Sequence, residues 1–397
     1  MIIRKYRLAA LAAAVTGLTA TLVAGGPAQA APTADDQALI DAARTYFTGE
    51  NALLVDGGTA ATKAAEQTQD LDVATPFRAE RNDRVEAREQ LRGINELAGV
   101  RYSAVDTDLT RLGPARTEGD TARISVREHT TYTFAGAKDD PYSYTVRHDL
   151  SFARSGDGWA LSRIVTQDGP ANLATPHKLD PQELDNVREL AAQLRTDSAV
   201  RKDERLADPA RKEGAADVAA KAADEVRPTA AYDYRAMVDF ATRHATPQPE
   251  DNVPYERDTN DCTNFISHSL AAGGWAEEVG WYQSDSAWWY NFNPWPFPDN
   301  HSYTWGGAVN WQRFARDESK RVYELSGPSG LGIADVVQFE IFGYSEPGEP
   351  GHTMMVTDFT ADGTPKMSYH TTDTLNKPIS EILAAHDDGE RFWYFRT

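Results

Sequence analysis

The stretch DCTNFISHSLAAGGW, residues 261–275, contains the only cysteine of the 397-residue chain, Cys262. Asp261 is a residue type that favours helix N-caps, and apolar residues then recur at helical spacing until a Gly-Gly pair supplies a stop. The pattern predicts a helix that begins at Cys262, where free backbone N–H groups and the helix dipole favour a thiolate. Cys262 also shares an apolar face with Phe265 and Ile266, so a small buried hydrophobic residue explains it equally well.

The amino terminus has the three parts of a secretory signal. These parts are a basic start (Arg4, Lys5, Arg7), an apolar run over residues 8–24, and the small-x-small site Ala28-Gln29-Ala30. A membrane anchor is the alternative, but the run is short for a span and no stop-transfer segment follows. The sequence therefore predicts a signal peptide over residues 1–30 and a secreted, extracellular mature protein. An unpaired thiol is a liability there, so Cys262 is either buried and inert or a nucleophile.

The composition limits the partners of the protein. The net charge is −20, and removal of the three basic residues of the signal would take it to −23. This charge repels phosphate backbones, and no basic cluster with interleaved aromatics relieves it, so nucleic acid is not an expected partner. No other segment is apolar enough to span a bilayer, so no membrane association is expected after signal removal. The oligomeric state stays open.

Two domains and a connector are predicted within the mature chain. Helical spacing from Asp35 to about Glu96 is followed by four runs rich in Thr, Tyr, Val and Ile, which predicts an α+β domain of unknown function over residues 31–170. The four runs form an expected antiparallel meander: Arg101–Thr110, Thr121–Phe134, Tyr142–Ala153 and Trp159–Val165. Residues 171–231 turn charged and alanine-rich, which predicts a helical linker. Aromatic content then rises, so the second domain is expected over residues 232–397.

Two histidines lie in strand-like runs that follow the cysteine. His352 opens the run 352–358, His370 lies in the run 366–371, and a turn between the runs allows them to pair as a hairpin. A cysteine at a helix start that faces a histidine on a strand is a thiol–imidazole arrangement. Periodicity does not show that these residues meet. The two histidines could also chelate zinc, but a lone cysteine and dispersed histidines offer no close ligand pair, so no metal or cofactor is expected.

The cysteine stretch resembles the signature DCTNF-x-S-x-x-L-x-x-GG of the Putative amidase domain family of secreted bacterial proteins. Further blocks match in the same order: Tyr234–Ala245, Ser302–Trp305, Val309–Trp311, Ile333–Val337, His352 in an H-x-x-x-V run, and Tyr369–Thr371 with Asp373. Ala334 replaces the glycine of the family's GDV block, and His268 stands where the family more often has glutamine. The family is related to NlpC-like and CHAP-like hydrolases, so the resemblance implies an α+β, papain-like fold for residues 230–397.

The resemblance also implies a mechanism: a cysteine-dependent amidase or peptidase that cleaves an amide bond through a thioester acyl-enzyme. Cys262 matches the nucleophile, His352 matches the general base, and His370 matches the polar third member that holds the tautomer of His352. The backbone N–H of Cys262 would be one oxyanion donor, and Asn260 and Tyr255 are candidates for the second by nearness in sequence. Cell-wall peptide is the substrate class that the related families imply.

An aromatic stretch follows the cysteine helix and contains Trp288, Trp289 and Trp305. These side chains either pack on the core or form the wall of a substrate groove beside Cys262. Two other functions stay open at this point. One is a catalytically inactive papain-like binding module, and the other is a thiol acyltransferase that uses an amine in place of water.

Overall fold

The structure of the protein is a computed structural model that describes residues 34–56, 63, 73–167, 176–206, 232–247, 252–291, 300–341, 344–386 and 389–397. The predicted signal peptide, residues 1–30, lies outside the described residues. The fold below is that of the compact unit Pro32–Thr397, within the described residues. Within the described ranges, no helix has the length and apolar character needed to cross a membrane.

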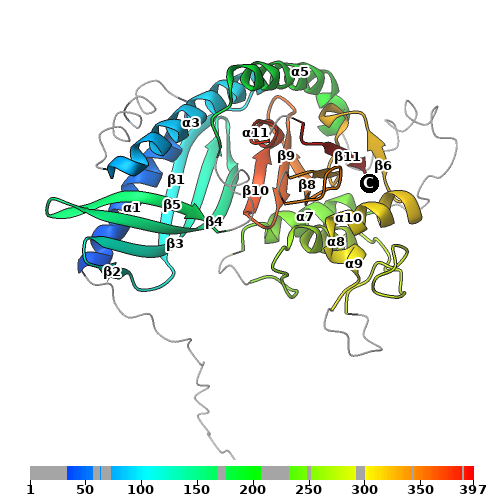
Figure 1. The fold of residues 1–397 in the computed structure, drawn as a ribbon. Coiled ribbons are helices and arrows are strands. Elements are labelled where there is room, and N and C mark those ends of the chain that lie inside the picture. The colour runs from blue at the N-terminus through cyan, green and yellow to red at the C-terminus, as the bar shows by residue number, and fades with distance from the viewer. Residues whose placement is uncertain are drawn as a thin grey trace, which may run out of the picture. The chain divides into compact units, whose positions relative to one another are not determined.

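Two helices cover one face of an antiparallel meander in the first half of this unit (Figure 1). The helices are α1 (Ala34–Ala52) and α3 (Arg78–Ala98), with the short helix η1 (Thr75–Phe77) before α3; the strands are β1 (Tyr102–Arg111), β2 (Arg116–Glu118), β3 (Thr121–Phe134), β4 (Ala137–Ser155) and β5 (Gly158–Thr166). Leu39, Ala43 and Phe47 of α1 are buried against the strands, as their spacing predicts. All four predicted strand runs are confirmed, with ends shifted by a few residues.

The predicted linker contains a long helix. The helix α5 (Pro181–Leu206) begins at a capping box, because Asp180 Oδ1 accepts from the backbone N–H of Glu183 (3.0 Å) and Glu183 Oε2 accepts from that of Asp180 (2.8 Å). Its residue Leu194 is buried in a core shared with the C-terminal strands. The rest of the predicted linker, residues 207–231, lies outside the described residues.

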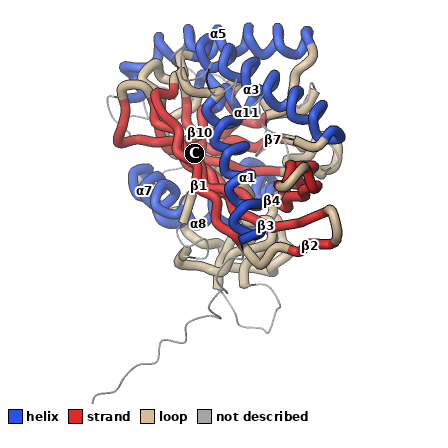
Figure 2. Tube along the Cα trace, turned by 90° about the vertical axis from the view of Figure 1, so that its left-hand side faces the viewer, coloured by secondary structure: helices blue, strands red, loops and turns tan. Residues whose placement is uncertain are grey.

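The C-terminal half places helices on both faces of a second group of strands (Figures 1 and 2). The strands are β6 (Tyr323–Leu325), β7 (Val336–Phe339), β8 (His352–Phe359), β9 (Pro365–Tyr369), β10 (Asp373–Pro378) and β11 (Phe392–Arg396), and the helical segments are α7 (Tyr234–His244), α8 (Cys262–Ala272), α9 (Tyr303–Gly306), α10 (Ala308–Gln312), η3 (Arg313–Glu318), η4 (Pro328–Gly330) and α11 (Ile379–Ala384). The helices α7 and α8 pack on one face, and α5 and α11 share a core with the other face. β8 and β9 pair as the predicted hairpin.

One sheet runs through both halves. Its strand order is β1-β3-β4-β10-β9-β8-β7-β11-β6, and neighbouring strands in this order pair antiparallel. The junction is the pairing of β10 with β4, where Asp373 lies opposite Thr145. The α+β class with a large antiparallel sheet agrees with the sequence. The boundaries 31–170, 171–231 and 232–397 stay predictions, but strands from the first and last of these segments pair directly.

Candidate functional site

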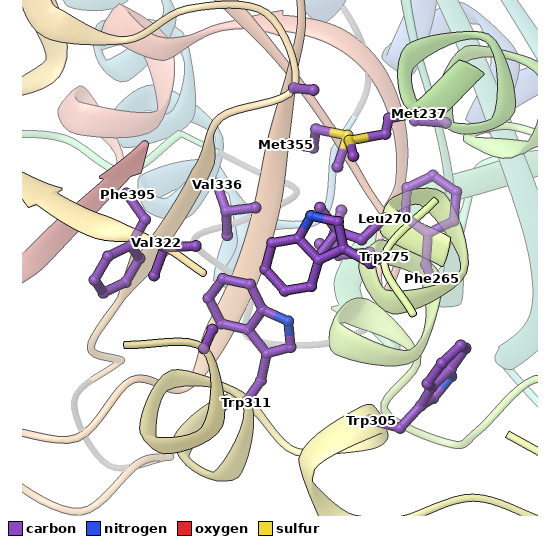
Figure 3. Packing of buried hydrophobic residues seen from close by; sticks show 14 of the residues in the cluster. Met237, Phe265, Leu270, Trp275, Trp305, Trp311, Val322, Val336, Met355 and Phe395 are labelled. Atoms are coloured by element: carbon purple, nitrogen blue, oxygen red, sulfur yellow. The ribbon is translucent and has the colours of Figure 1, made fainter. Parts of the chain in front are cut away.

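The cysteine lies at the start of a helix, as the sequence predicts. Cys262 is the first residue of α8, and only 1% of its surface is exposed. The apolar face of α8 packs Phe265 and Leu270 beside Trp275 and Met355 in the core of this half (Figure 3). This packing fixes the helix against β8 and therefore fixes the position of the thiol.

The thiol of Cys262 has polar neighbours on several sides. Its Sγ donates to Asn260 Oδ1 (3.4 Å) and lies 3.7 Å from Thr263 Oγ1. Burial raises the pKa of the thiol above its usual value. The Thr263 hydroxyl and the backbone N–H groups of Thr353 and Thr263 act in the opposite direction, because they stabilise a thiolate. Burial and the nearby Asp261 thus favour the protonated thiol, whereas these hydrogen-bond donors would support its anion.

Asp261 does not cap the helix with its side chain. Its Oδ2 accepts from His370 Nδ1 (2.6 Å) and Tyr255 Oη (3.1 Å), while its Oδ1 accepts from Asn264 Nδ2 (2.8 Å). Arg257 lies against the same carboxylate (Nε to Oδ2, 3.3 Å). So many donors indicate that Asp261 is ionised although it is buried. The predicted N-cap residue is therefore the centre of a buried polar network.

His370 lies on the α8 face of the strands, where its ring stacks on Phe265 with centroids 4.1 Å apart. Its Nδ1 contacts the Asp261 carboxylate, and its Nε2 contacts the backbone oxygen of His244 (2.8 Å). The backbone oxygen only accepts, so Nε2 donates to it, and Nδ1 lies between the Asp261 carboxylate and the Tyr255 hydroxyl (3.2 Å). In this geometry neither ring nitrogen contacts His352, so the role that the resemblance implies for His370 stays a prediction.

His352 lies on the opposite face of β8. In the β7–β8 pairing it is opposite Phe339, and its ring packs against Phe339 and Tyr369 at centroid distances of 5.1 and 5.0 Å. The next residue, Thr353, points to α8 and contacts Thr263 (2.8 Å between hydroxyl oxygens). Successive side chains of a strand alternate between faces, so the described structure does not bring the His352 imidazole to Cys262. Burial lowers the pKa of His352 to about 3, with a smaller effect of His386 in the same direction.

The three tryptophans belong to the core, which corrects the expectation of a groove wall. Trp288, Trp289 and Trp305 are exposed by only 0%, 3% and 1%. Their indole N–H groups donate to Ser267 Oγ (3.2 Å), the backbone oxygen of Gly280 (3.0 Å) and Asn264 Oδ1 (2.9 Å), respectively. Large aromatics with satisfied N–H groups stabilise the packing around α8 and do not offer rings to a substrate.

A cavity of about 380 Å³ lies beside α10 and η3. Gln312, Arg313, Arg316, Glu349 and Pro350 are among its lining residues, and Cys262 is not. A buried chain of contacts nevertheless leads from the cavity to the thiol. Gln312 Nε2 donates to Gln338 Oε1 (3.2 Å), Gln338 Nε2 donates to Thr353 Oγ1 (3.0 Å), and Thr353 contacts Thr263 beside the sulfur.

Arg257 is a site residue that carries no signal in the sequence that could have singled it out, whereas Ala334 stands out there as a departure from the family's glycine. Arg257 forms a bidentate pair with Asp373 (2.8 and 2.6 Å) and so joins the network of Asp261 to β10. Ala334, where the related sequences have glycine, has φ = 63°, a left-handed conformation that glycine adopts without strain. The described residues contain no group of three or more His, Cys, Asp or Glu side chains that could hold a metal ion.

Comparison with known proteins finds similarity to one family in this half of the chain. Residues 231–395 match the sequence model of a family described as Putative amidase domain, which supports amide hydrolysis as the activity of this segment. Among solved structures, the crystal structure of Kfla4162 protein from Kribbella flavida is similar at 16% identity over 38% of this chain and 97% of that chain. Its TM-score of 0.23 is too low to define a common fold. No curated protein matches the chain.

Proposed function

We propose that the protein is a secreted, cysteine-dependent amidase or peptidase in which Cys262 is the nucleophile. The observation that carries this proposal is the position of Cys262 within the matched amidase segment. Its sulfur lies at the N-terminus of α8, near backbone N–H groups that would stabilise a thiolate against the burial that raises the pKa of the thiol. The papain-like relationship, the export of the protein and cell-wall peptide as the substrate are parts of the same proposal.

The reaction is acyl transfer through sulfur. The Cys262 thiolate attacks the carbonyl carbon of the amide, an S–C bond forms, and the carbonyl electron pair moves to oxygen. Collapse of this intermediate re-forms the carbonyl and expels the amine, which takes a proton. Water then hydrolyses the thioester and regenerates the thiol. Each step needs a group that moves a proton near the sulfur.

His352 is our candidate for the group that moves this proton. The peptide bond after His352 supplies the Thr353 N–H that stabilises the thiolate, so the residue is adjacent to the site through its backbone. To act as the base, its imidazole must leave the Phe339 side and reach the α8 side of β8. His352 is the first residue of β8, so the change would involve the end of a strand and not its middle.

The test measures hydrolysis of a mixture of bacterial cell-wall peptides by the full-length protein. Newly released amino groups are counted with an amine-reactive dye. Cys262→Ala should abolish the release, and Cys262→Ser, which keeps nearly the same shape, should reduce it to a small residue because a hydroxyl is a poor nucleophile here. Full release by either variant would show that the cysteine is not the nucleophile. Added hydroxylamine or glycine amide would be incorporated into the product if the protein were an acyltransferase.

A second candidate function is a catalytically inactive binding module. The 1% exposure of Cys262 and the position of the His352 ring on the far face of β8 favour it. Iodoacetamide labelling separates the two functions. An enzyme should be labelled in the native state at a rate that rises with pH, whereas an inactive module should be labelled only in denaturant.

A further inference from the structure

A chain of buried side chains links the sulfur of Cys262 to the backbone of α10. Gln338 Nε2 contacts both the backbone oxygen of Ala308 (2.9 Å) and Thr353 Oγ1 (3.0 Å). Thr353 Oγ1 lies 2.8 Å from Thr263 Oγ1, which in turn lies 3.7 Å from Cys262 Sγ. The side chains of Gln338, Thr353 and Thr263 belong to residues that are 0% exposed, so solvent does not compete for these contacts.

The backbone oxygen of Ala308 fixes the direction of this chain. A carbonyl oxygen only accepts hydrogen bonds, so the nitrogen of the Gln338 amide, and not its oxygen, faces Ala308. The same nitrogen donates its second proton to Thr353, and the amide oxygen accepts from Gln312 Nε2 (3.2 Å). Every donor and acceptor of the Gln338 side chain is therefore assigned.

The protons of the two threonine hydroxyls follow from this assignment. The Gln338 nitrogen has no lone pair to accept the Thr353 proton, and within the described residues the other partner of that hydroxyl is Thr263 Oγ1. Thr353 therefore donates to Thr263. The Thr263 hydroxyl contacts only Thr353 and the sulfur in the described part of the chain, so its own proton points to Cys262 Sγ.

We propose that the Thr263 hydroxyl is a further catalytic group, which donates to the sulfur of Cys262 and stabilises the thiolate. Thr353 and Gln338 are positioning residues that fix the direction of this donation. The proposal rests on the function proposed above, because it concerns activation of the same thiol. A thiolate carries its charge on the atom that the Thr263 proton faces, whereas a neutral thiol gains less from the same contact. The hydrogen bond that Thr263 accepts from Thr353 also polarises its hydroxyl and strengthens it as a donor.

The test titrates the thiol directly in the full-length protein. A thiolate absorbs ultraviolet light that a thiol does not, and Cys262 is the only cysteine. The absorbance difference between each protein and the same protein with Cys262→Ser therefore follows one group as the pH is raised. Thr263→Val removes the hydroxyl but keeps the shape of the side chain, and it should raise the midpoint of this titration by about one pH unit. Thr263→Ser keeps the hydroxyl and should restore the midpoint.

Substitutions of Thr353 distinguish a directed chain from a local contact. Thr353→Val should raise the midpoint by less than Thr263→Val does, and Thr353→Ser should restore it. The two valine substitutions together should give the midpoint of Thr263→Val alone, because Thr353 acts only through the Thr263 hydroxyl. Additive shifts, or no shift in Thr353→Val, would overturn the positioning role. Circular dichroism checks that each variant is folded, and Thr263→Ala gives the same measurement if Thr263→Val does not fold.

The outcomes also separate this proposal from the proposed function. If the release of amino groups depends on Cys262 but Thr263→Val keeps the midpoint of the unaltered protein, the nucleophile stands and the role of Thr263 is overturned. If Thr263→Val shifts the midpoint but the unaltered protein releases no amino groups, the hydrogen bond to the sulfur is confirmed. The proposed function, and with it the catalytic role of Thr263, would then be overturned.

Discussion

The Nδ1 atom of His370 lies 2.6 Å from Oδ2 of Asp261, the residue that directly precedes Cys262. The pair is buried, and His370 is also bound to the backbone of His244 at the end of α7. One imidazole ring therefore connects the β9–β10 turn, the start of α8 and the end of α7. In this arrangement His370 positions the helix that carries the thiol, and it acts through Asp261.

This arrangement predicts a large loss of stability for His370→Gln. The change leaves the buried Asp261 carboxyl group without its closest hydrogen-bond partner, which costs about 1–3 kcal/mol. Urea denaturation at pH 7 measures the loss. His244→Ala keeps the backbone oxygen that accepts from His370 and should cost much less. A His370→Gln variant as stable as the unaltered protein would show that the contacts of His370 do not hold the start of α8 in place.

The position of His352 predicts a stability that falls with decreasing pH. The pKa of His352 is lowered to about 3, chiefly by burial, from 6.5 in an unfolded chain. Below pH 6.5 the unfolded state therefore binds a proton that the folded state does not, and this favours unfolding until about pH 3. The loss is about 1.4 kcal/mol per pH unit, or about 2 kcal/mol between pH 6.5 and pH 5.

Comparison of urea denaturation at pH 6.5 and pH 5 for the unaltered protein and His352→Leu checks this prediction. The variant should lose about 2 kcal/mol less over the same interval, because it has no group to protonate there. His268, whose pKa burial lowers to about 4, contributes to both proteins and cancels in the difference. Equal losses would show that His352 is solvated or already paired in the folded state.

The sequence predicts the secondary structure around the site better than it predicts the contacts between side chains. The helix that begins at Cys262 and the hairpin of β8 and β9 follow from apolar periodicity and turn residues, and both are confirmed. The sequence does not predict on which face of the sheet the His352 side chain lies. β8 is buried on both faces, so its apolar run shows no alternation that would assign a side. The turn of Asp261 away from its cap position depends on His370, over a hundred residues later, which local patterns cannot reveal.

The left-handed backbone conformation of Lys320 predicts that a glycine at this position stabilises the protein. It is an exposed residue with φ = 52°, just after η3, in the left-handed region that costs a residue with a Cβ roughly 1–2 kcal/mol. Lys320→Gly should therefore raise the midpoint of thermal unfolding, with a gain of about 1 kcal/mol after the greater flexibility of glycine in the unfolded chain is included. Differential scanning calorimetry measures the change. Lys320→Ala keeps the Cβ and should give no comparable gain; a gain of the same size would attribute the effect to the lost charge.

The hydrogen bonds of Glu381 predict that contacts between the two halves of the sheet contribute to the free energy of unfolding of the whole protein. Its Oε1 accepts from Asn95 Nδ2 (2.7 Å) and from Tyr102 Oη (2.6 Å), so one buried oxygen of α11 satisfies donors on α3 and β1. Glu381→Ala leaves both donors buried without a partner, at about 1–3 kcal/mol each. Glu381→Gln keeps an oxygen in the same place and should lose only a small part of that stability. In urea denaturation of the full-length chain, the free energy of unfolding should therefore be highest for the unaltered protein and slightly lower for Glu381→Gln. It should be several kcal/mol lower again for Glu381→Ala. If the two variants were equally stable, the contact between α11 and the first half would contribute little, and the pairing of β10 with β4 would have to hold the halves together.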